Sequence, residues 1–462
     1  MVFSSLIFIC IFLPIVLLTY NISKNISYKN TVLIIASLAF YAWGEPVWII
    51  LLLFSSVTDY FHGLIIDKYR GKIGAKLALI SSLILNLGLL FVFKYSGFIM
   101  ENINSAFKLS LPIPQFTLPI GISFYTFQTL SYTIDVYNHK AKVQTSFLRF
   151  LTFVSLFPQL VAGPIVRYKD IATELRKRTV TAYDFSRGAE KFVCGLAKKI
   201  LLANNAGDTA QMLMTSIHMS TLTAWLGVLF YTFQIYFDFS GYSDMAIGLG
   251  RMFGFHFKEN FEHPYISRSI TEFWRRWHIS LSSFFRDYVY IPLGGNRRHH
   301  ILNMFIVWGL TGLWHGASWN FIIWGLFYGI ILFIEKKCFN GILQRLPWPL
   351  CHIYTMVIVM FGWAIFYFTD TTELLNCIKC MLFINTVPYD LVAISTLYEN
   401  LWLILICVVA CLPWPKILYR HFTEVHSGIC TVVEPLVITA GFILCFIMLT
   451  GQSYNPFLYF RF

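Results

Sequence analysis

Long apolar runs recur along the whole chain, and they restrict it to folds that a lipid bilayer can surround. Of its 462 residues, 57% are hydrophobic and only 13% are charged, whereas about 25% of the residues in a soluble domain are charged. A helix of about 20 apolar residues crosses the hydrocarbon core and satisfies its own backbone hydrogen bonds there. The sequence therefore predicts an all-α, multi-pass membrane protein that contacts the lipid bilayer directly.

The apolar runs predict about ten to thirteen membrane segments. They lie at residues 3–20, 31–44, 46–66, 77–97, 117–137, 148–163, 219–239, 301–319, 319–335, 352–369, 400–414 and 430–450, with less regular candidates at 183–204 and 240–256. Several runs are shorter than a full span, which favours tilted or re-entrant segments. No polar stretch is long enough for a soluble domain, so we expect a single membrane domain over residues 1–462.

Basic loops give an orientation. The formal charge of +12 comes from lysines and arginines in short clusters, including those at residues 21–30, 67–76 and 138–149. Cytoplasmic loops are enriched in such residues, so we place these three loops in the cytoplasm and the N-terminus outside, and expect no nucleic-acid partner. Pro158 and Gly163 interrupt the run at 148–163, and Pro164 follows it directly. We interpret this run as a segment that enters and returns on one side, which keeps the basic residues of 167–178 in the cytoplasm.

Residues 265–320 hold the densest cluster of functional groups in the chain. Apolar residues recur there at three- and four-residue steps from Ile270 to Tyr288, which predicts an amphipathic helix ended by Pro292 and the glycines after it. Its basic face suits the membrane–water interface. His278 falls on the apolar side of this helix, so we expect it to face protein or membrane.

His315 lies in the apolar run at 301–319, between Trp314 and Gly316. An ionisable residue in a membrane segment is a functional-site candidate. An imidazole can take a proton from a hydroxyl and return it. The alternative, from sequence alone, is a histidine that joins two helices by a hydrogen bond.

Two other segments carry polar residues within apolar surroundings. Residues 117–137 contain seven such side chains and should face the protein interior, because buried polar groups need partners. Residues 230–244 contain Gln234, Asp238 and Asp244. The two aspartates are candidates to orient an imidazole or anchor an arginine, and the alternative is a structural role in a helix-to-helix hydrogen bond or an arginine pair.

Arg275, Arg276, Arg297 and Arg298 flank the histidine motifs. Guanidinium groups bind phosphate, so these arginines are candidates to contact a phosphate-bearing acyl donor. Anchoring to anionic lipid is the alternative.

Several other chemistries lack a sequence signature. The chain has no Gly-rich phosphate loop of the Walker or Rossmann type, no HExxH metal motif and no GxSxG elbow. Cys377 and Cys380 form a single CxxC without a second pair, and the other cysteines are scattered. We therefore expect no metal and no bound cofactor.

The sequence resembles the membrane-bound O-acyltransferase (MBOAT) superfamily, in particular its branch of alginate O-acetylation proteins and peptidoglycan O-acetyltransferases. The resemblance extends over nearly the whole chain. It rests on the segments at residues 118–132, 157–168, 233–248, 273–297, 311–325 and 455–462.

The resemblance implies a ring of tilted and re-entrant helices around a central funnel, with a catalytic core at about 117–335. It implies that His315 is essential and that His278 is the second characteristic histidine. We take Trp314, Gln234 and Asn303 as supporting residues. The implied reaction moves an acyl group from a cytoplasmic thioester, such as acetyl-CoA, to a cell-surface polysaccharide across a bacterial cytoplasmic membrane. An extracytoplasmic SGNH-like transferase is the implied partner.

Two alternatives remain. The first is D-alanyl transfer to teichoic acid by a relative with the same architecture. The second is a transporter in which His315, His278, Asp238 and Asp244 relay protons.

Overall fold

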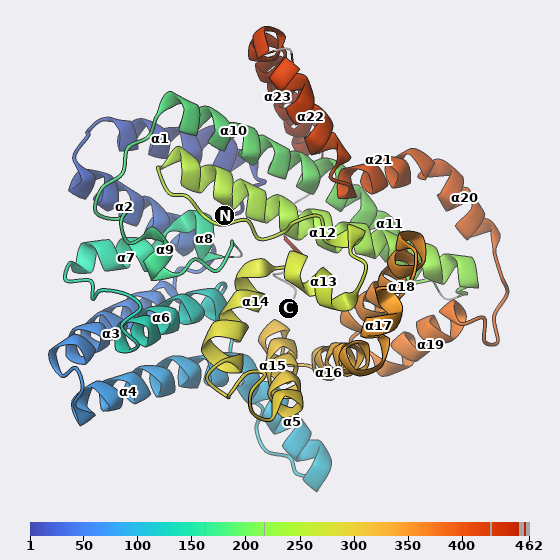
Figure 1. Cartoon of the computed structure of the whole chain (residues 1–462), viewed down its shortest axis with the longest axis horizontal. Helices are drawn as coiled ribbons and strands as arrows, with labels where there is room; N and C mark the ends of the chain where they lie inside the picture. Colours follow the sequence, from blue (N-terminus) through green and yellow to red (C-terminus); the bar gives the residue numbers. More distant parts are fainter. Residues whose placement is uncertain (162, 217, 426, 452–456, 459–462) are drawn as a thin grey trace. The chain divides into compact units, whose positions relative to one another are not determined.

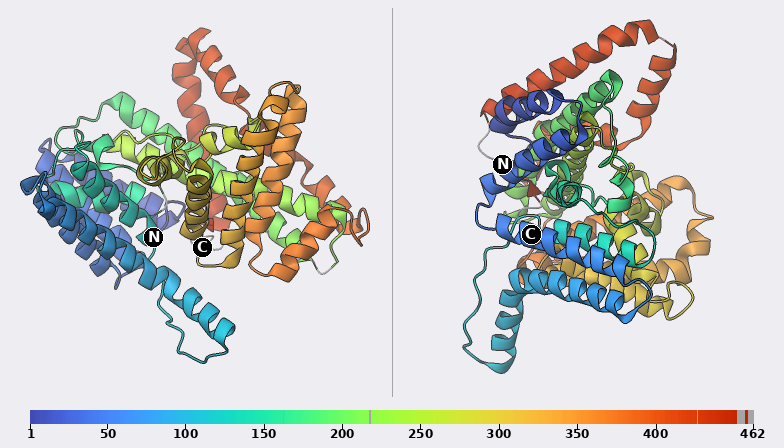
Figure 2. Two further views of the ribbon diagram at one scale, coloured as in Figure 1. Left: turned by 60° about the horizontal axis from the view of Figure 1, so that its bottom comes forward. Right: turned by 90° about the vertical axis from the view of Figure 1, so that its left-hand side faces the viewer.

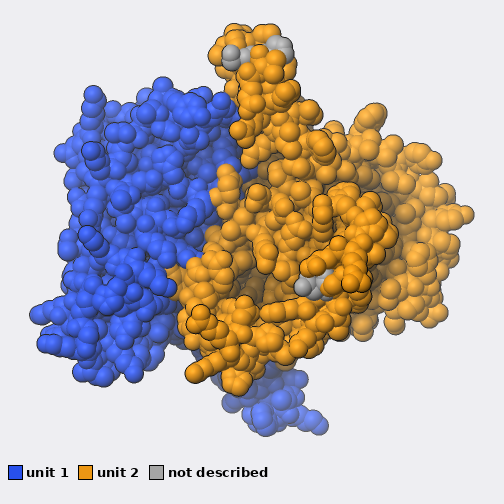
Figure 3. All heavy atoms as spheres, viewed as in Figure 1, with its two compact units in different colours: residues 1–192, 243–258 blue, residues 193–242, 259–462 orange. Residues whose placement is uncertain are grey.

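Every regular element in the described part of the chain is a helix, as predicted (Figure 1). The structure, a computed structural model, describes residues 1–161, 163–216, 218–425, 427–451 and 457–458. The chain packs into two units, which Figure 3 distinguishes by colour. Unit 1 comprises Met1–Phe192 and Ser243–Lys258, and unit 2 comprises Val193–Tyr242 and Glu259–Phe462. The single domain expected over 1–462 stays a prediction, as does the ring with its funnel.

The elements of unit 1 come mainly from the N-terminal part of the chain. They are η1 (Phe8–Phe12), α1 (Leu13–Asn21), α2 (Ile26–Gly44), α3 (Ile49–Lys68), α4 (Ile73–Leu90), η2 (Phe91–Tyr95), α5 (Ser96–Phe107), α6 (Ile122–Tyr137), α7 (Phe147–Ser155), α8 (Phe157–Leu160) and α9 (Tyr168–Ile171). Two helices, α10 (Ala182–Ala197) and α12 (Thr221–Met252), contribute residues to both units.

The elements of unit 2 carry the histidine motifs and the C-terminal part of the chain. They are η3 (Lys198–Ala203), α11 (Asn204–Met214), η4 (Pro264–Ile266), α13 (Ile270–Arg276), α14 (Ile279–Phe285), η5 (Arg286–Tyr290), α15 (His300–His315), α16 (Trp319–Ile334), η6 (Glu335–Phe339), α17 (Asn340–Leu343), α18 (Trp348–Tyr367), α19 (Thr371–Met381), α20 (Leu391–Glu399), α21 (Leu401–Cys411), α22 (Trp414–Val425) and α23 (Ser427–Gly451).

Four helices of the described chain are long and apolar enough by themselves to cross a membrane, fewer than the ten to thirteen predicted segments. They are Ile49–Lys68, Ile73–Phe107, Trp348–Tyr367 and Gly428–Gly451, and the pair α20–α21, bent by 62°, would make a fifth. The other predicted segments are largely helical too, but their helices are shorter or less apolar; α6, α15 and α16, for instance, have 16 residues each. The run at 148–163, for example, becomes α7 and α8, of nine and four residues. A nine-residue helix is only about 14 Å long, less than half of the hydrocarbon thickness.

Helix α6 is buried along nearly its whole length, as its polar composition predicted. It packs against α3 and α4, and the three helices share a network around Asp59. The carboxylate of Asp59 accepts hydrogen bonds from Ser82 Oγ at 2.6 Å and from Asn86 Nδ2 at 2.7 Å. Thr129 of α6 donates to Asn86 at 3.3 Å. The groups of this network are therefore paired with one another, whereas the buried side chains of Gln128 and Tyr125 in α6 have no hydrogen-bond partner among the described residues.

Hydrogen bonds in unit 1 support the re-entrant interpretation of 148–163. Asn30, where α2 begins, donates to the Leu175 carbonyl at 3.1 Å and accepts from Arg178 at 2.7 Å. Gln144 donates to the Tyr168 hydroxyl at 3.0 Å. The basic segment after the short α7 and α8 therefore lies at the same end of unit 1 as two loops predicted to be cytoplasmic.

We expect Lys177→Cys to react with a membrane-impermeant thiol reagent from the same side as Lys72→Cys, and from the side opposite to Lys108→Cys. The reason is that the hydrogen bonds above join the 168–178 segment to the predicted cytoplasmic loops. The measurement is labelling of sealed right-side-out and inside-out vesicles, with the exposed Cys10, Cys194 and Cys338 replaced by serine. Labelling of Lys177→Cys together with Lys108→Cys would show that 148–163 crosses the membrane.

Candidate active site

Helices α15 and α16 of unit 2 approach each other at two glycines and thereby fix His315. The two helices pack side by side, and α16 also contacts α18 (Figure 2). A Cβ atom added to Gly325 would lie 3.3 Å from the Cα atom of Gly312 and would overlap the Trp308 carbonyl. Glycine is required because the backbones touch. His315 is the last residue of α15, and the extended Gly316 follows it.

The His315 ring is buried among aromatic side chains. Its centroid lies 5.0 Å from the rings of Trp314 and Trp324 and 5.2 Å from the ring of Phe366. The three contacts are edge-on, and the side chain is only 7% exposed. This packing holds the imidazole in one orientation, which an acid–base group needs.

His278 is where the structure differs from the sequence prediction. The single amphipathic helix expected from Ile270 onward is wrong, because the chain breaks between α13 and α14. His278 itself has φ +44°, in the left-handed region that few residues other than glycine adopt. Such strain persists only where the surroundings impose it, and it is frequent at functional sites. The prediction that His278 faces inward is confirmed, since it is 2% exposed.

The tautomer of His278 follows from its neighbours. Its Nδ1 lies 3.2 Å from Oδ1 of Asn260. That oxygen already accepts hydrogen bonds from the backbone N–H and the hydroxyl of Ser280. Nδ1 therefore carries the proton and donates, which leaves a lone pair on Nε2. Nε2 is buried without a hydrogen-bond partner among the described residues, so it is available to accept a hydrogen bond.

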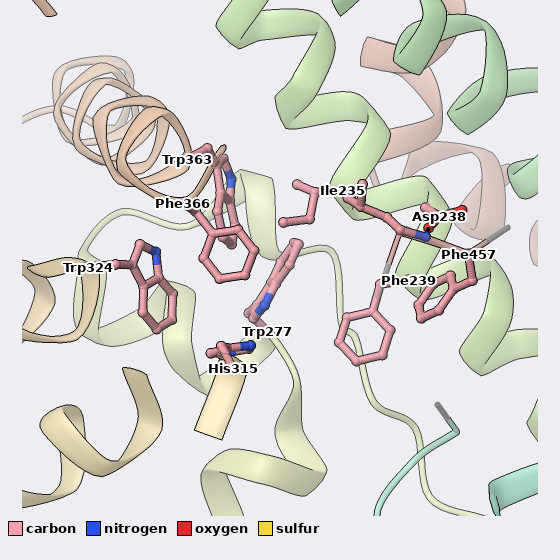
Figure 4. A pocket seen from close by; sticks show the side chains of 10 residues that line it. Ile235, Asp238, Phe239, Trp277, His315, Trp324, Trp363, Phe366 and Phe457 are labelled. Carbon is pink, nitrogen blue, oxygen red and sulfur yellow. Dashed lines mark hydrogen bonds between the residues drawn. The ribbon is translucent and has the colours of Figure 1, made fainter. Parts of the chain in front are cut away.

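Two pockets of unit 2 meet at His315 and Trp277. The first, which we call the aromatic pocket, has a free volume of about 30 Å³ (Figure 4). Its lining residues are Ile235, Asp238, Phe239, Trp277, His315, Trp324, Trp363, Phe366, Phe457 and Leu458. The second, the arginine pocket, has a free volume of about 250 Å³. Its lining includes His278, Ser282, Arg275, Arg286 and Tyr290 together with His315. His315 thus contacts a small apolar space and a larger space with cationic groups.

The predicted arginines do not all reach the site. Arg275 lines the arginine pocket. Arg276 instead pairs with Glu272 at 2.9 Å and donates to the Glu262 carbonyl at 3.2 Å. Arg297 is exposed in the loop before α15. Arg286, which the sequence prediction omitted, lines the pocket and pairs with Asp287 at 2.7 Å.

The two predicted aspartates have lysine partners. Asp238 lies in the aromatic pocket and forms an ion pair with Lys199 at 2.5 Å, both side chains being buried. Asp244 belongs to unit 1 and pairs with Lys191 at 3.1 Å. These ion pairs fit the alternative of a structural role, although the partner of each carboxylate is a lysine and not an arginine. Gln234 packs against Gly207 of α11.

Trp314 and Asn303 occupy supporting positions. The ring of Trp314 contacts both histidines, with its centroid 5.8 Å from that of His278 and 5.0 Å from that of His315. The Asn303 amide donates to three carbonyls of the preceding loop, those of Leu293, Gly295 and Arg298. Asn303 thus fixes the loop that leads into α15.

Sequence reasoning missed Asn260 and Glu335, which hold the segment around His278. Buried Glu335 accepts hydrogen bonds from the backbone N–H groups of Ile270 and Thr271 at 2.7 and 2.9 Å, where α13 begins. Neither residue lies near the segment in sequence. The sequence feature that could have pointed to Glu335 is its position as an acidic residue at the end of the apolar run 319–335.

We expect His278 to make the protein less stable at acidic pH. Burial lowers the pKa of His278 to about 3, whereas the unfolded imidazole titrates near 6.5. Below pH 6.5 the unfolded chain therefore binds a proton that the folded chain does not, and stability falls by about 2 kcal/mol between pH 7 and pH 5. The measurement is thermal unfolding of purified protein at both pH values, with His278→Gln as the comparison. An equal pH dependence in both proteins would contradict this assignment.

The matching family model and the following three relatives are all named for the transfer of an acyl group. Residues 139–378 match the sequence model of MBOAT, the membrane-bound O-acyltransferase family. The chain is 44% identical over 374 residues to the "probable alginate O-acetylase AlgI" of Pseudomonas aeruginosa, covering 79% of this chain and 72% of that protein. It is 32% identical over 520 residues to the peptidoglycan O-acetyltransferase of Helicobacter pylori, covering 100% and 98%. It is 31% identical over 271 residues to the teichoic acid D-alanyltransferase of Bacillus subtilis, covering 54% and 68%.

Proposed function

The chain belongs to the membrane-bound O-acyltransferase family, and on that premise we propose that it moves an acetyl group from a cytoplasmic thioester to a cell-surface polysaccharide. It is a multi-pass membrane O-acyltransferase. The proposal concerns the donor, the acceptor and the membrane, which we take to be the bacterial cytoplasmic membrane. An SGNH-like transferase outside the membrane is the proposed partner where transfer is indirect.

One observation carries the catalytic part of the proposal: His315 lines both pockets at the place where they meet. Acyl transfer brings a donor and an acceptor to one atom, so a base accessible from two spaces suits it. In the reaction the acceptor hydroxyl oxygen attacks the acyl carbon while His315 takes the hydroxyl proton. The carbon–sulfur bond then breaks, and the thiolate recovers the proton from the imidazolium.

The arginine pocket supports a thioester donor with phosphate groups, such as acetyl-CoA. Arg275 and Arg286 supply guanidinium groups, and His278 and Ser282 add polar groups to the same lining. Guanidinium binds phosphate oxygens in a bidentate geometry. The unpartnered Nε2 of His278 is suited to accept a hydrogen bond from the donor's amide or hydroxyl groups.

The acceptor is proposed to be a hydroxyl of a polysaccharide. The relatives that cover most of this chain are named for alginate O-acetylation and peptidoglycan O-acetylation. The D-alanyltransferase relative covers only about half of it, which favours acetyl over D-alanyl transfer. None of the three relatives named above is named for transport, so they give the transporter alternative no support.

The test is the ester content of the cell surface in cells that lack the protein. We expect the deletion to remove O-acetyl ester from the surface polysaccharide and wild-type protein to restore it. Acetate and D-alanine released by mild base are measured in the same hydrolysate. Loss of D-alanine with unchanged acetate would favour D-alanyl transfer, and no change in either ester would contradict acyl transfer to the envelope.

The donor is tested separately with purified protein in proteoliposomes. Acetyl-CoA labelled in the acetyl group should be consumed when it is supplied on the face that carries Lys72, and not from the other face. Consumption from the face that carries Lys108 would contradict a cytoplasmic donor.

A further inference from the structure

We propose that Phe457 and Leu458, here called the tail, form a wall of the acetyl site, that the hydrogen bond from the Leu458 N–H to the buried carboxylate of Asp238 holds this wall in place, and that the wall keeps water from the thioester. The proposal rests on the function proposed above and adds to it a role for Phe457, Leu458, Asp238 and Lys199.

The carboxylate of Asp238 has a different partner at each oxygen. Oδ1 lies 2.5 Å from the ammonium of Lys199 in η3, and Oδ2 accepts a hydrogen bond of 2.7 Å from the backbone N–H of Leu458. Asp238 is 1% exposed and Lys199 is 4% exposed. A charged acceptor makes a stronger hydrogen bond than a neutral one, and more so away from water. A single residue of α12 thus joins two segments that are more than two hundred positions apart.

The two side chains of the tail contribute directly to the aromatic pocket. Phe457 is buried against Phe239 and Tyr242 of α12, with ring centroids 5.8 and 4.8 Å apart. Leu458 packs into the hydrophobic core of unit 2. Both residues line the same pocket as His315, and Figure 4 shows Phe457 beside Asp238 and Phe239.

The other side of the aromatic pocket is made by rigid helices. Trp324 of α16 and Trp363 and Phe366 of α18 belong to long helices that pack against each other. Among the described residues, the hydrogen bond from the Leu458 N–H joins the tail to Asp238 of α12. Removing that hydrogen bond should loosen this wall while the histidine and its aromatic neighbours stay in place.

A loosened wall has a definite chemical consequence. The free volume of about 30 Å³ holds about two water-sized groups, the size of an acetyl group. If the wall opens, water can reach the acyl carbon in place of the acceptor hydroxyl. Water then adds to that carbon, the carbon–sulfur bond breaks, and one acetic acid and one thiol form for each thioester consumed. Enclosed sites commonly exclude this side reaction.

The experiment compares two double variants that differ in one property. Asp238→Asn/Lys199→Gln replaces the ion pair by neutral groups and keeps an amide oxygen for the Leu458 N–H. Asp238→Leu/Lys199→Met removes that acceptor. Both avoid leaving a single buried charge, which would itself be strongly destabilising. Phe457→Ala is the third variant and thins the wall directly. Asp184→Asn, which breaks a carboxylate pair with Arg251 at the other end of α12, is the control.

Each purified variant is given acetyl-labelled acetyl-CoA and a polysaccharide acceptor, and the ratio of free acetate to acetyl ester is measured. We expect the ratio to rise about tenfold, equivalent to ~1.4 kcal/mol, in Asp238→Leu/Lys199→Met and in Phe457→Ala. The Asn/Gln variant and the control should keep the wild-type ratio. If the Leu/Met variant does not fold, Phe457→Ala still decides.

An unchanged ratio in Phe457→Ala, with active wild-type protein, would overturn the inference and leave the proposed function intact. A rise in the Asn/Gln variant equal to that in the Leu/Met variant would overturn the role of the Leu458 hydrogen bond. Wild-type protein that consumes no acetyl-CoA would instead refute the proposed donor.

Discussion

His315→Gln is expected to lower the rate of acetyl transfer by about 10²- to 10⁴-fold, the usual contribution of a general acid–base residue. Glutamine has nearly the same volume and can hydrogen-bond, but it cannot take a proton from the acceptor hydroxyl. The side chains packed around the ring, Trp314, Trp324 and Phe366, cannot take a proton in its place. The measurement is single-turnover transfer from labelled acetyl-CoA.

The control for this loss is His352→Gln. His352 lies in α18, stacked on Trp348 with ring centroids 5.0 Å apart, and lines neither pocket. It should retain activity within about twofold, as substitutions away from a site usually do. Transfer by His315→Gln within threefold of wild type would remove His315 from the chemistry and leave it a packing role. Equal losses in both variants would indicate a general sensitivity of the fold.

Gly325→Leu is expected to unfold the α15–α16 pair and to remove all activity. The new side chain would overlap the Trp308 carbonyl and approach Gly312, where neither backbone can move without separating the helices. Overpacking a tight contact costs about 1–3 kcal/mol and occasionally more, and here the clash is with backbone. The measurement is the melting temperature and the yield of monodisperse protein.

Gly309→Leu is the matched control for this prediction. Gly309 also lies in α15, but a Cβ added there meets nothing within 4 Å. It should keep the wild-type melting temperature within a few degrees, since a surface change is typically worth about 0.5 kcal/mol. Normal yield and activity of Gly325→Leu would show that the two helices separate freely and that His315 does not depend on their contact.

The predictions from the sequence were most accurate where all the informative residues lie on a single helix. The polarity of residues 117–137 correctly predicted a buried helix, because seven polar side chains on a single apolar segment have no stable place in lipid. His315 at the end of an apolar run was likewise visible as a candidate, since an ionisable residue there is costly without a purpose.

The sequence predicted less where partners come from distant segments. The apolar spacing around His278 fits a continuous helix, and nothing local marks the left-handed turn that interrupts it. That turn depends on Asn260 and Glu335, which are 18 and more than 50 residues away from His278. Lys199 as the partner of Asp238 was hidden for the same reason. Of the predicted arginines, Arg275 lines the arginine pocket, whereas Arg276 and Arg297 do not. The spacing of residues along the sequence does not reveal where an exposed side chain points.

The network around Asp59 also bears on how the protein is made. As α3 leaves the ribosome, the Asp59 carboxylate lacks the hydrogen bonds that Ser82 and Asn86 of α4 later donate, and its neighbour within α3 is the His62 ring at 3.2 Å. An aspartate at the centre of a helix costs about 2.5–3.5 kcal/mol on insertion into lipid. We therefore expect α3 to wait at the insertion machinery until Ser82 and Asn86 have been synthesised. Helix α3 would then be translated before α4 but would enter the bilayer together with it. Asp59, Ser82 and Asn86 would enter as one preassembled group.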